Sequence, residues 1–118
     1  MPDQADAVQA QLDKLRKKYG RELPEKVSRV EAALATLIAG PWEEQACMTA
    51  YRHAHSLAGS SGTYGYNEIA KIARAAEASL KQCLESRAAL SEPLKAQVHD
   101  LVAKLRELAS AVAREMSA

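Results

Sequence analysis

The apolar residues of this chain recur at alternating spacings of three and four positions, and this pattern constrains the fold more than any other feature. Such spacing places side chains on one face of an α-helix, whereas a half-buried strand would alternate at every second residue. Two stretches carry the pattern most fully, one through Leu23, Val27, Val30, Leu34 and Leu37 and the other through Leu94, Val98, Leu101, Leu105, Leu108 and Val112. Each stretch therefore predicts a helix with one buried face.

Three further stretches carry related patterns. Two of them are built from smaller side chains, which let helices approach closely. One contains Cys47, Ala50, Ala54, Leu57 and Ser61, and the other contains Ile69, Ile72, Ala73, Ala76, Leu80 and Cys83. The third is N-terminal and contains Val8, Leu12, Leu15 and Tyr19. We expect this N-terminal stretch to cover one end or flank of the other four.

Glycine and proline separate these stretches and indicate where helices end. Proline suits the first turn of a helix, and glycine suits the residue after the last turn. The boundary residues are Gly20, Pro24, Gly40, Pro41, Gly65 and Pro93. They predict five helices, at about 4–19, 22–39, 42–64, 67–87 and 91–116. Asn67 and Ser91 are the expected N-caps of the last two.

Short connections between long amphipathic helices favour antiparallel neighbours. We therefore predict an all-α fold, an antiparallel up-and-down four-helix bundle with an additional N-terminal helix. The 118 residues match one domain, with residues 1–20 as the flanking helix and residues 21–116 as the bundle. Aromatic residues make up only 4% of the chain, and glycines and prolines are few, which disfavours β-sandwich and disordered classes.

Charge and cysteine content argue against several functions. Sixteen basic and fifteen acidic side chains give a formal net charge of +1, too little for an electrostatic nucleic-acid binder. Cys47 and Cys83 form no CxxC pair, so we expect buried thiols in a reducing cytoplasm rather than a zinc finger or a disulfide framework. No signal-peptide pattern or long apolar run is present, so no membrane partner is expected.

One segment departs from ordinary helix composition. From His55 to Gly65 the chain reads His-Ser-Leu-Ala-Gly-Ser-Ser-Gly-Thr-Tyr-Gly. A glycine inside a helix costs roughly 1 kcal/mol relative to alanine, so we expect a compensating role. Gly59 follows His55 by four residues, and helical side chains lean toward the N-terminus, so glycine at this position leaves the imidazole uncovered. His55 is therefore predicted to lie at the edge of the buried face and to remain reachable.

The histidines do not indicate a metal site. His53 lies about 160° around the helix from His55, so the two rings cannot ligate one ion from a single helix. His53 and His99 have no partner at a useful spacing, and we expect structural roles for both. The acidic side chains are too scattered for a hydrolytic or metal enzyme. We predict no metal ligands.

The segment resembles the signature of histidine-containing phosphotransfer (HPt) domains, His-x-Leu-Lys-Gly-Ser-Ser-x-x-x-Gly. Ala58 replaces the lysine of that pattern. The family pattern extends into the next helix, and this chain matches it at Gly65, Ile69, Ile72, Ala73 and Glu77 but departs from it at Tyr66 and Ala76. A match of this length within an independently predicted bundle is a specific signal.

The resemblance implies that His55 accepts a phosphoryl group from a receiver-domain phosphoaspartate and passes it to another receiver aspartate. Neutral imidazole is a usable nucleophile near pH 7, because its ordinary pKa is about 6.5. The receiver would supply magnesium, so we expect no cofactor of this chain. The chain shows no P-loop and no recognisable ATP-binding domain, so we expect no autokinase activity. The implied partners are response-regulator receiver domains and a hybrid sensor kinase, and the chain is expected to be a monomer.

Arg52, Gly59 and Gly62 share the helix stripe of His55 and are the expected supporting residues. Arg52 lies three positions before the histidine and is a candidate for the positive charge that a family lysine would supply. The alternative for Arg52 is an ordinary surface position. Both interpretations stay open at the level of the sequence.

The hydroxyl residues Ser60, Ser61 and Thr63 are expected to bond to helix carbonyls rather than to take part in chemistry. For Ser60, simple solvation is the alternative. A different interpretation of the whole chain is a structural bundle that binds a protein or dimerises without phosphotransfer. Such a bundle would need neither an exposed His55 nor Gly59. The glycine-rich segment therefore distinguishes the two functions.

Overall fold

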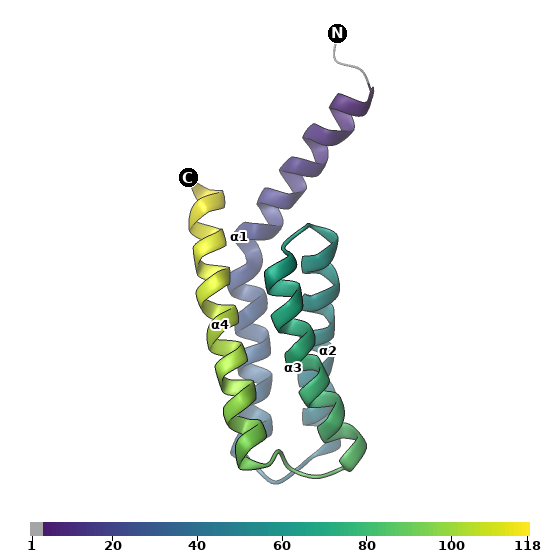
Figure 1. Ribbon diagram of the computed structural model, residues 1–118, viewed down its shortest axis with the longest axis vertical. Coiled ribbons are helices and arrows are strands. Elements are labelled where there is room, and N and C mark those ends of the chain that lie inside the picture. The colour runs from purple at the N-terminus through teal and green to yellow at the C-terminus, as the bar shows by residue number, and fades with distance from the viewer. Residues whose placement is uncertain (1–3) are drawn as a thin grey trace.

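The computed structural model describes residues 4–118, and in this range the chain forms four α-helices and no strand. The helices are α1 (Gln4–Ala39), α2 (Glu44–Thr63), α3 (Asn67–Ser86) and α4 (Glu92–Ser117). Consecutive helices run in opposite directions and are joined by short connections (Figure 1). α1 and α3 each pack against both α2 and α4, which confirms the predicted helical bundle. Residues 1–3, where the expected flanking helix begins, lie outside the described range.

The core consists mainly of aliphatic side chains at the predicted positions. Every stripe residue predicted on the second segment of α1 and on α2 is buried, and on α3 the single exception is the half-buried Ile72. On α4 the buried line is Val98, Val102, Leu105 and Ala109. Four of the six residues predicted as core on this helix are only partly buried, namely Leu94, Leu101, Leu108 and Val112. The reason is that α4 is rotated so that Val102 and Ala109 face the bundle centre.

The prediction of five helices was wrong at one boundary, because the two N-terminal segments form the single helix α1. Gly20 and Pro24 lie inside α1 rather than at a boundary. No Ser, Thr, Asp or Asn stands between them to cap a new helix. Pro24 lacks the N–H that would bond to the carbonyl of Gly20, and proline commonly bends a continuous helix. Figure 1 shows the purple N-terminal part of α1 leaning away from the bundle axis.

The expectation that the N-terminal segment covers the bundle was right for Tyr19, which is 6% exposed, and wrong for the other three residues of its stripe. Val8, Leu12 and Leu15 are 54%, 51% and 37% exposed. α4 ends beside Arg21, whose guanidinium donates to the carbonyl of Met116, and the α2–α3 turn reaches Arg16, whose Nε donates to the carbonyl of Tyr64. The part of α1 before Arg16 therefore projects beyond its neighbours (Figure 1). The bundle is too short at this end to cover the stripe.

Three tyrosines close the bundle where α1 leaves it. The ring of Tyr19 stacks on those of Tyr64 and Tyr66, with centroid distances of 4.7 and 5.9 Å. The Tyr66 hydroxyl donates to the carbonyl of Arg16 at 2.8 Å, and burial raises the pKa of this phenol. A Cβ at Gly20 would lie 2.5 Å from the same hydroxyl oxygen. The close approach of the Tyr66 hydroxyl therefore explains why position 20 is a glycine, and the bond to Arg16 explains why position 66 carries a hydroxyl group.

Cys47 on α2 and Cys83 on α3 are buried free thiols, as predicted. Their sulfur atoms contact backbone carbonyls, that of Leu80 at 3.7 Å from Cys47 and that of Ala88 at 3.0 Å from Cys83. Burial, together with the neighbouring thiol of Cys83, raises the pKa of Cys47 to about 12. The Cys47 thiol therefore stays protonated at neutral pH.

Candidate functional site

The glycine-rich segment forms the C-terminal half of α2 and the turn into α3. Gly65 has a φ of +82°, in the left-handed region that favours glycine. Its N–H bonds to the carbonyl of Gly62, and the N–H of Tyr66 bonds to the carbonyl of Ser61. This pair of bonds is the Schellman arrangement that closes a helix. Gly65 therefore sets the geometry of the α2–α3 turn.

The hydroxyl residues of the segment make structural hydrogen bonds. Ser60 and Thr63 each donate to the carbonyl four residues earlier, at 2.8 and 3.1 Å, which confirms the expectation for these two. Ser61 instead lies 2.9 Å from the hydroxyl oxygen of Tyr19, and Ser60 lies 2.6 Å from the same atom. The serines of the motif thus tie α2 to α1.

His55 lies on the side of α2 that faces α3, with its side chain 68% exposed. Its Nδ1 atom is 2.5 Å from Oε2 of Glu77 on α3. A carboxylate can only accept, so Nδ1 carries the proton in this contact, and in the neutral ring Nε2 keeps its lone pair. The ring of Tyr51 stacks on the imidazole, with centroids 6.0 Å apart. The imidazole is therefore oriented while Nε2 remains available.

Glu77 is the residue to which the sequence argument assigned no role, although it matched the family pattern. Its side chain is only 21% exposed, so solvent screens its contact with the imidazole less than it would screen a fully exposed pair. Both His55 and Glu77 lie eleven positions from Tyr66 at the turn. Two antiparallel helices joined by so short a turn bring such positions to the same level, and this spacing is the signal that could have identified the pair.

The two glycines beside His55 lie in different surroundings. A Cβ at Gly59 would meet no atom within 4 Å, so this position borders open space. A Cβ at Gly62 would lie 3.2 Å from Nη2 of Arg74, a side chain of α3. Gly62 therefore gives the Arg74 guanidinium room to lie across α2. Arg74 lies outside the motif that begins at His55, so the motif did not predict this cation.

The two positions considered for a positive charge differ in burial. Arg52 is exposed and has no hydrogen bond or ion pair within residues 4–118. Ala58 is 3% exposed and belongs to the core cluster. A lysine at position 58 would have to run its aliphatic stem out between α2 and α3. The alanine therefore fills a packing position and leaves no gap where a lysine would stand.

The other histidines lie elsewhere. His53 lines a small hollow of about 50 Å³ between α1 and α2, together with Lys26 and Arg29. His99 is exposed on α4, with Nδ1 3.6 Å from a carboxylate oxygen of Asp100. Among the described residues, no three His, Cys, Asp or Glu side chains are arranged to hold a metal ion.

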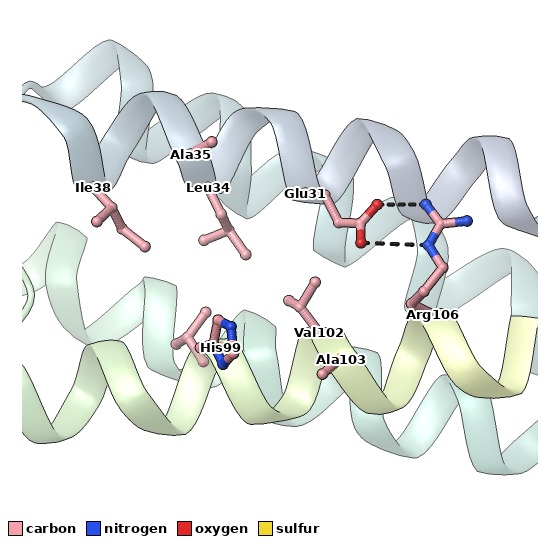
Figure 2. A pocket seen from close by; sticks show the side chains of 9 residues that line it. Glu31, Leu34, Ala35, Ile38, His99, Val102, Ala103 and Arg106 are labelled. Carbon is pink, nitrogen blue, oxygen red and sulfur yellow. Dashed lines mark hydrogen bonds and ion pairs between the residues drawn. The ribbon is translucent and has the colours of Figure 1, made fainter.

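A groove of about 440 Å³ runs between α1 and α4, and α2 and α3 contribute nothing to its lining. Figure 2 shows apolar side chains of the two helices facing each other, with the ion pair of Glu31 and Arg106 at one end. The hydrogen bonds that Arg106 donates to the carboxylate of Glu31 raise the pKa of the guanidinium above its ordinary value. This groove lies across the bundle from the α2–α3 pair, so it is separate from the surface that carries His55.

Comparison with known proteins identifies one family. A family model for the Hpt domain matches residues 14–111, a range that includes all of α2 and α3. The comparisons with curated proteins and with solved structures found no match. Within the described residues, no helix combines the length and the apolar character that a membrane span requires. The match extends over most of the chain and includes the His55 segment and Glu77, and the chain therefore belongs to the Hpt domain family.

Proposed function

We propose that this chain is a phosphocarrier of a phosphorelay, in which His55 accepts a phosphoryl group from a receiver phosphoaspartate and passes it to another receiver. Membership of the Hpt family supports histidine phosphotransfer in general. One observation carries the choice of residue: Glu77 engages Nδ1 of His55 and leaves Nε2 on an exposed surface. Neither His53 nor His99 has a contact with a carboxylate of another helix in residues 4–118.

The proposed step is an attack by Nε2 on the phosphorus of the receiver's acyl phosphate. The nitrogen lone pair forms the N–P bond, and the P–O bond breaks with its electron pair on the aspartate carboxylate. Nδ1 keeps its proton, so the ring gains positive charge as the bond forms. The carboxylate of Glu77 stabilises that developing charge. Acyl phosphate and phosphohistidine are both high in energy, so the transfer runs in either direction.

The charge around the transferring phosphoryl group is proposed to come mainly from the receiver, which supplies magnesium and its own lysine and hydroxyl. This chain has alanine at position 58, so the usual family cation is missing. Arg52 and Arg74 are the cations we propose on the α2–α3 side. The proposed partners are receiver domains and a hybrid sensor kinase, and the proposed location is the cytoplasm.

The test is incubation with a panel of receiver domains phosphorylated with radiolabelled phosphate. We expect the label to move to this chain as an adduct that acid destroys and base leaves intact, which is the behaviour of phosphohistidine. A folded chain that accepts label from no receiver would favour the alternative of a structural bundle that binds proteins or dimerises.

Gly59→Leu should slow transfer by about tenfold or more without lowering stability. A leucine at this position leans toward the turn that carries His55 and obstructs the receiver's approach. The added side chain meets open space, and leucine is a better helix former than glycine, so the melting temperature should stay constant or rise. Initial transfer rates and thermal melts measure both effects.

The matched control for this experiment is Gly59→Ala, which improves helix propensity without adding bulk over the ring. It should raise stability and leave the transfer rate within about twofold of the unaltered chain. An unchanged rate in Gly59→Leu would show that access to His55 does not depend on this glycine.

Glu77→Gln should lower the transfer rate by about tenfold, because the amide can still accept a hydrogen bond but carries no charge to offset the cationic ring. The measurement is the initial rate at saturating receiver, combined with ¹⁵N NMR of the imidazole. Glu85→Gln removes a charge from an exposed position of the same helix and should have no effect. Equal rates for both variants would contradict the role of Glu77.

A further inference from the structure

Tyr51 lies one helical turn before His55, and its ring stacks on the imidazole. The ring centroids are 6.0 Å apart and the ring planes differ by 17°. These values fall within the range of favourable offset-stacked ring pairs. Helical side chains lean toward the N-terminus, so the ring of His55 extends over the turn that carries Tyr51. The contact therefore follows directly from the spacing of four residues.

Tyr51 is itself fixed by the bundle. Its side chain is half-buried and packs against the hydrophobic core, whereas the side chain of His55 is 68% exposed. Glu77 holds the Nδ1 edge of the imidazole from α3. Tyr51 thus holds one face of the ring, and Glu77 holds the edge that carries Nδ1. Within residues 4–118, Nε2 makes no hydrogen bond.

Phosphorylation of His55 would strengthen the contact with Tyr51. Nδ1 keeps its proton while Nε2 forms the bond to phosphorus, so the neutral ring becomes a cation. The face of a tyrosine ring attracts a cation within about 6 Å of its centroid. An interaction that is stronger in the transition state and product than in the reactant accelerates the step and favours the product.

We propose that Tyr51 is a positioning residue of the phosphotransfer site: it holds the imidazole in the orientation from which Nε2 reacts, and it stabilises the phosphorylated ring. This inference rests on the function proposed above and deepens it. The signature motif begins at His55, so it contains neither Tyr51 nor this contact. The role belongs to the tyrosine ring face and not to the hydroxyl group.

Proton NMR of the unphosphorylated chain tests the contact without any transfer reaction. In Tyr51→Leu, the imidazole protons of His55 should lose the ring-current shift caused by the stacked tyrosine. The imidazole protons of His99, on α4, provide an internal reference that should not move. Tyr51→Phe keeps the ring and should keep the shift. Unchanged His55 resonances in Tyr51→Leu would overturn the positioning role.

Transfer from a phosphorylated receiver tests the stabilisation. Tyr51→Leu preserves apolar contact with the core but removes the ring, and it should slow transfer about three- to tenfold and lower the phosphorylated fraction at equilibrium. Tyr51→Phe should remain within about twofold of the unaltered chain. Thermal melts confirm that both variants are folded.

The outcomes separate this inference from the proposed function. If the unaltered chain accepts no phosphoryl group from any receiver, the proposed function fails. If the unaltered chain accepts the group and Tyr51→Leu accepts it equally fast and to the same extent, only the role of Tyr51 fails. Equal losses in Tyr51→Phe and Tyr51→Leu would also overturn that role, because the hydroxyl would then be the active group.

Discussion

Replacement of His55 by glutamine should abolish labelling by every receiver that labels the unaltered chain. Glutamine keeps polarity and approximate size but has no nucleophilic ring nitrogen. The His55 side chain is 68% exposed, and surface substitutions of this kind usually change stability by no more than about 0.5 kcal/mol. The loss should therefore be complete in a chain whose thermal melt is nearly unchanged. Radiolabel on the purified protein, checked for acid lability, measures the effect.

The matched controls are His53→Gln and His99→Gln, which remove the other two imidazoles of the chain. Both should retain full labelling, because neither ring has the contact with Glu77 that leaves Nε2 of His55 available. Label that persists in His55→Gln, or disappears in His53→Gln with His55 intact, would place the phosphoacceptor elsewhere.

Gly20→Ala should destabilise the bundle by about 1–3 kcal/mol, although alanine favours a helix by about 1 kcal/mol over glycine. The new Cβ would lie 2.5 Å from Tyr66 Oη, 2.8 Å from Met116 Cγ and 3.1 Å from Val112 Cγ1. Met116 has a flexible side chain, but the Tyr66 hydroxyl is held by its bond to the carbonyl of Arg16. Denaturant titration measures the change in the free energy of unfolding.

Gly40→Ala is the control, because a Cβ at this position meets nothing within 4 Å and the substitution should leave stability unchanged or raise it. A second test combines Gly20→Ala with Tyr66→Phe, which removes the crowded oxygen. Tyr66→Phe should destabilise the Gly20→Ala chain less than it destabilises the unaltered one. Strictly additive effects would show that the strain does not lie at that hydroxyl.

The helices were predictable where one face of each is buried, since burial alone produces the spacing of three and four. The boundary near position 20 was not predictable in this way. A glycine followed by a proline usually indicates a helix end, but Gly20 is required by the hydroxyl of Tyr66, which is distant in sequence. The exposed Val8, Leu12 and Leu15 show a related limit, because their spacing is that of a core stripe while the bundle ends before it reaches them.

Within the candidate site, the sequence was most informative about features that depend on residues close together in the sequence. The motif singled out His55 and the turn at Gly65, and both depend on local spacing. The contact of Glu77 depends on how α2 and α3 are aligned, which no short motif encodes. Likewise, the motif indicated a missing positive charge at position 58, whereas the structure shows that Ala58 is buried in the core.

The buried thiols between α2 and α3 make the chain suitable for measuring how often these two helices separate. The thiolate, and not the thiol, is the form of cysteine that reacts with thiol reagents. Burial and the neighbouring thiol of Cys83 raise the pKa of Cys47 to about 12. A maleimide should therefore not modify Cys47 in the closed bundle and should react only after an opening that exposes it. The rate of this modification would report on the separation of α2 and α3, and a receiver that binds across His55 and Glu77 should slow it.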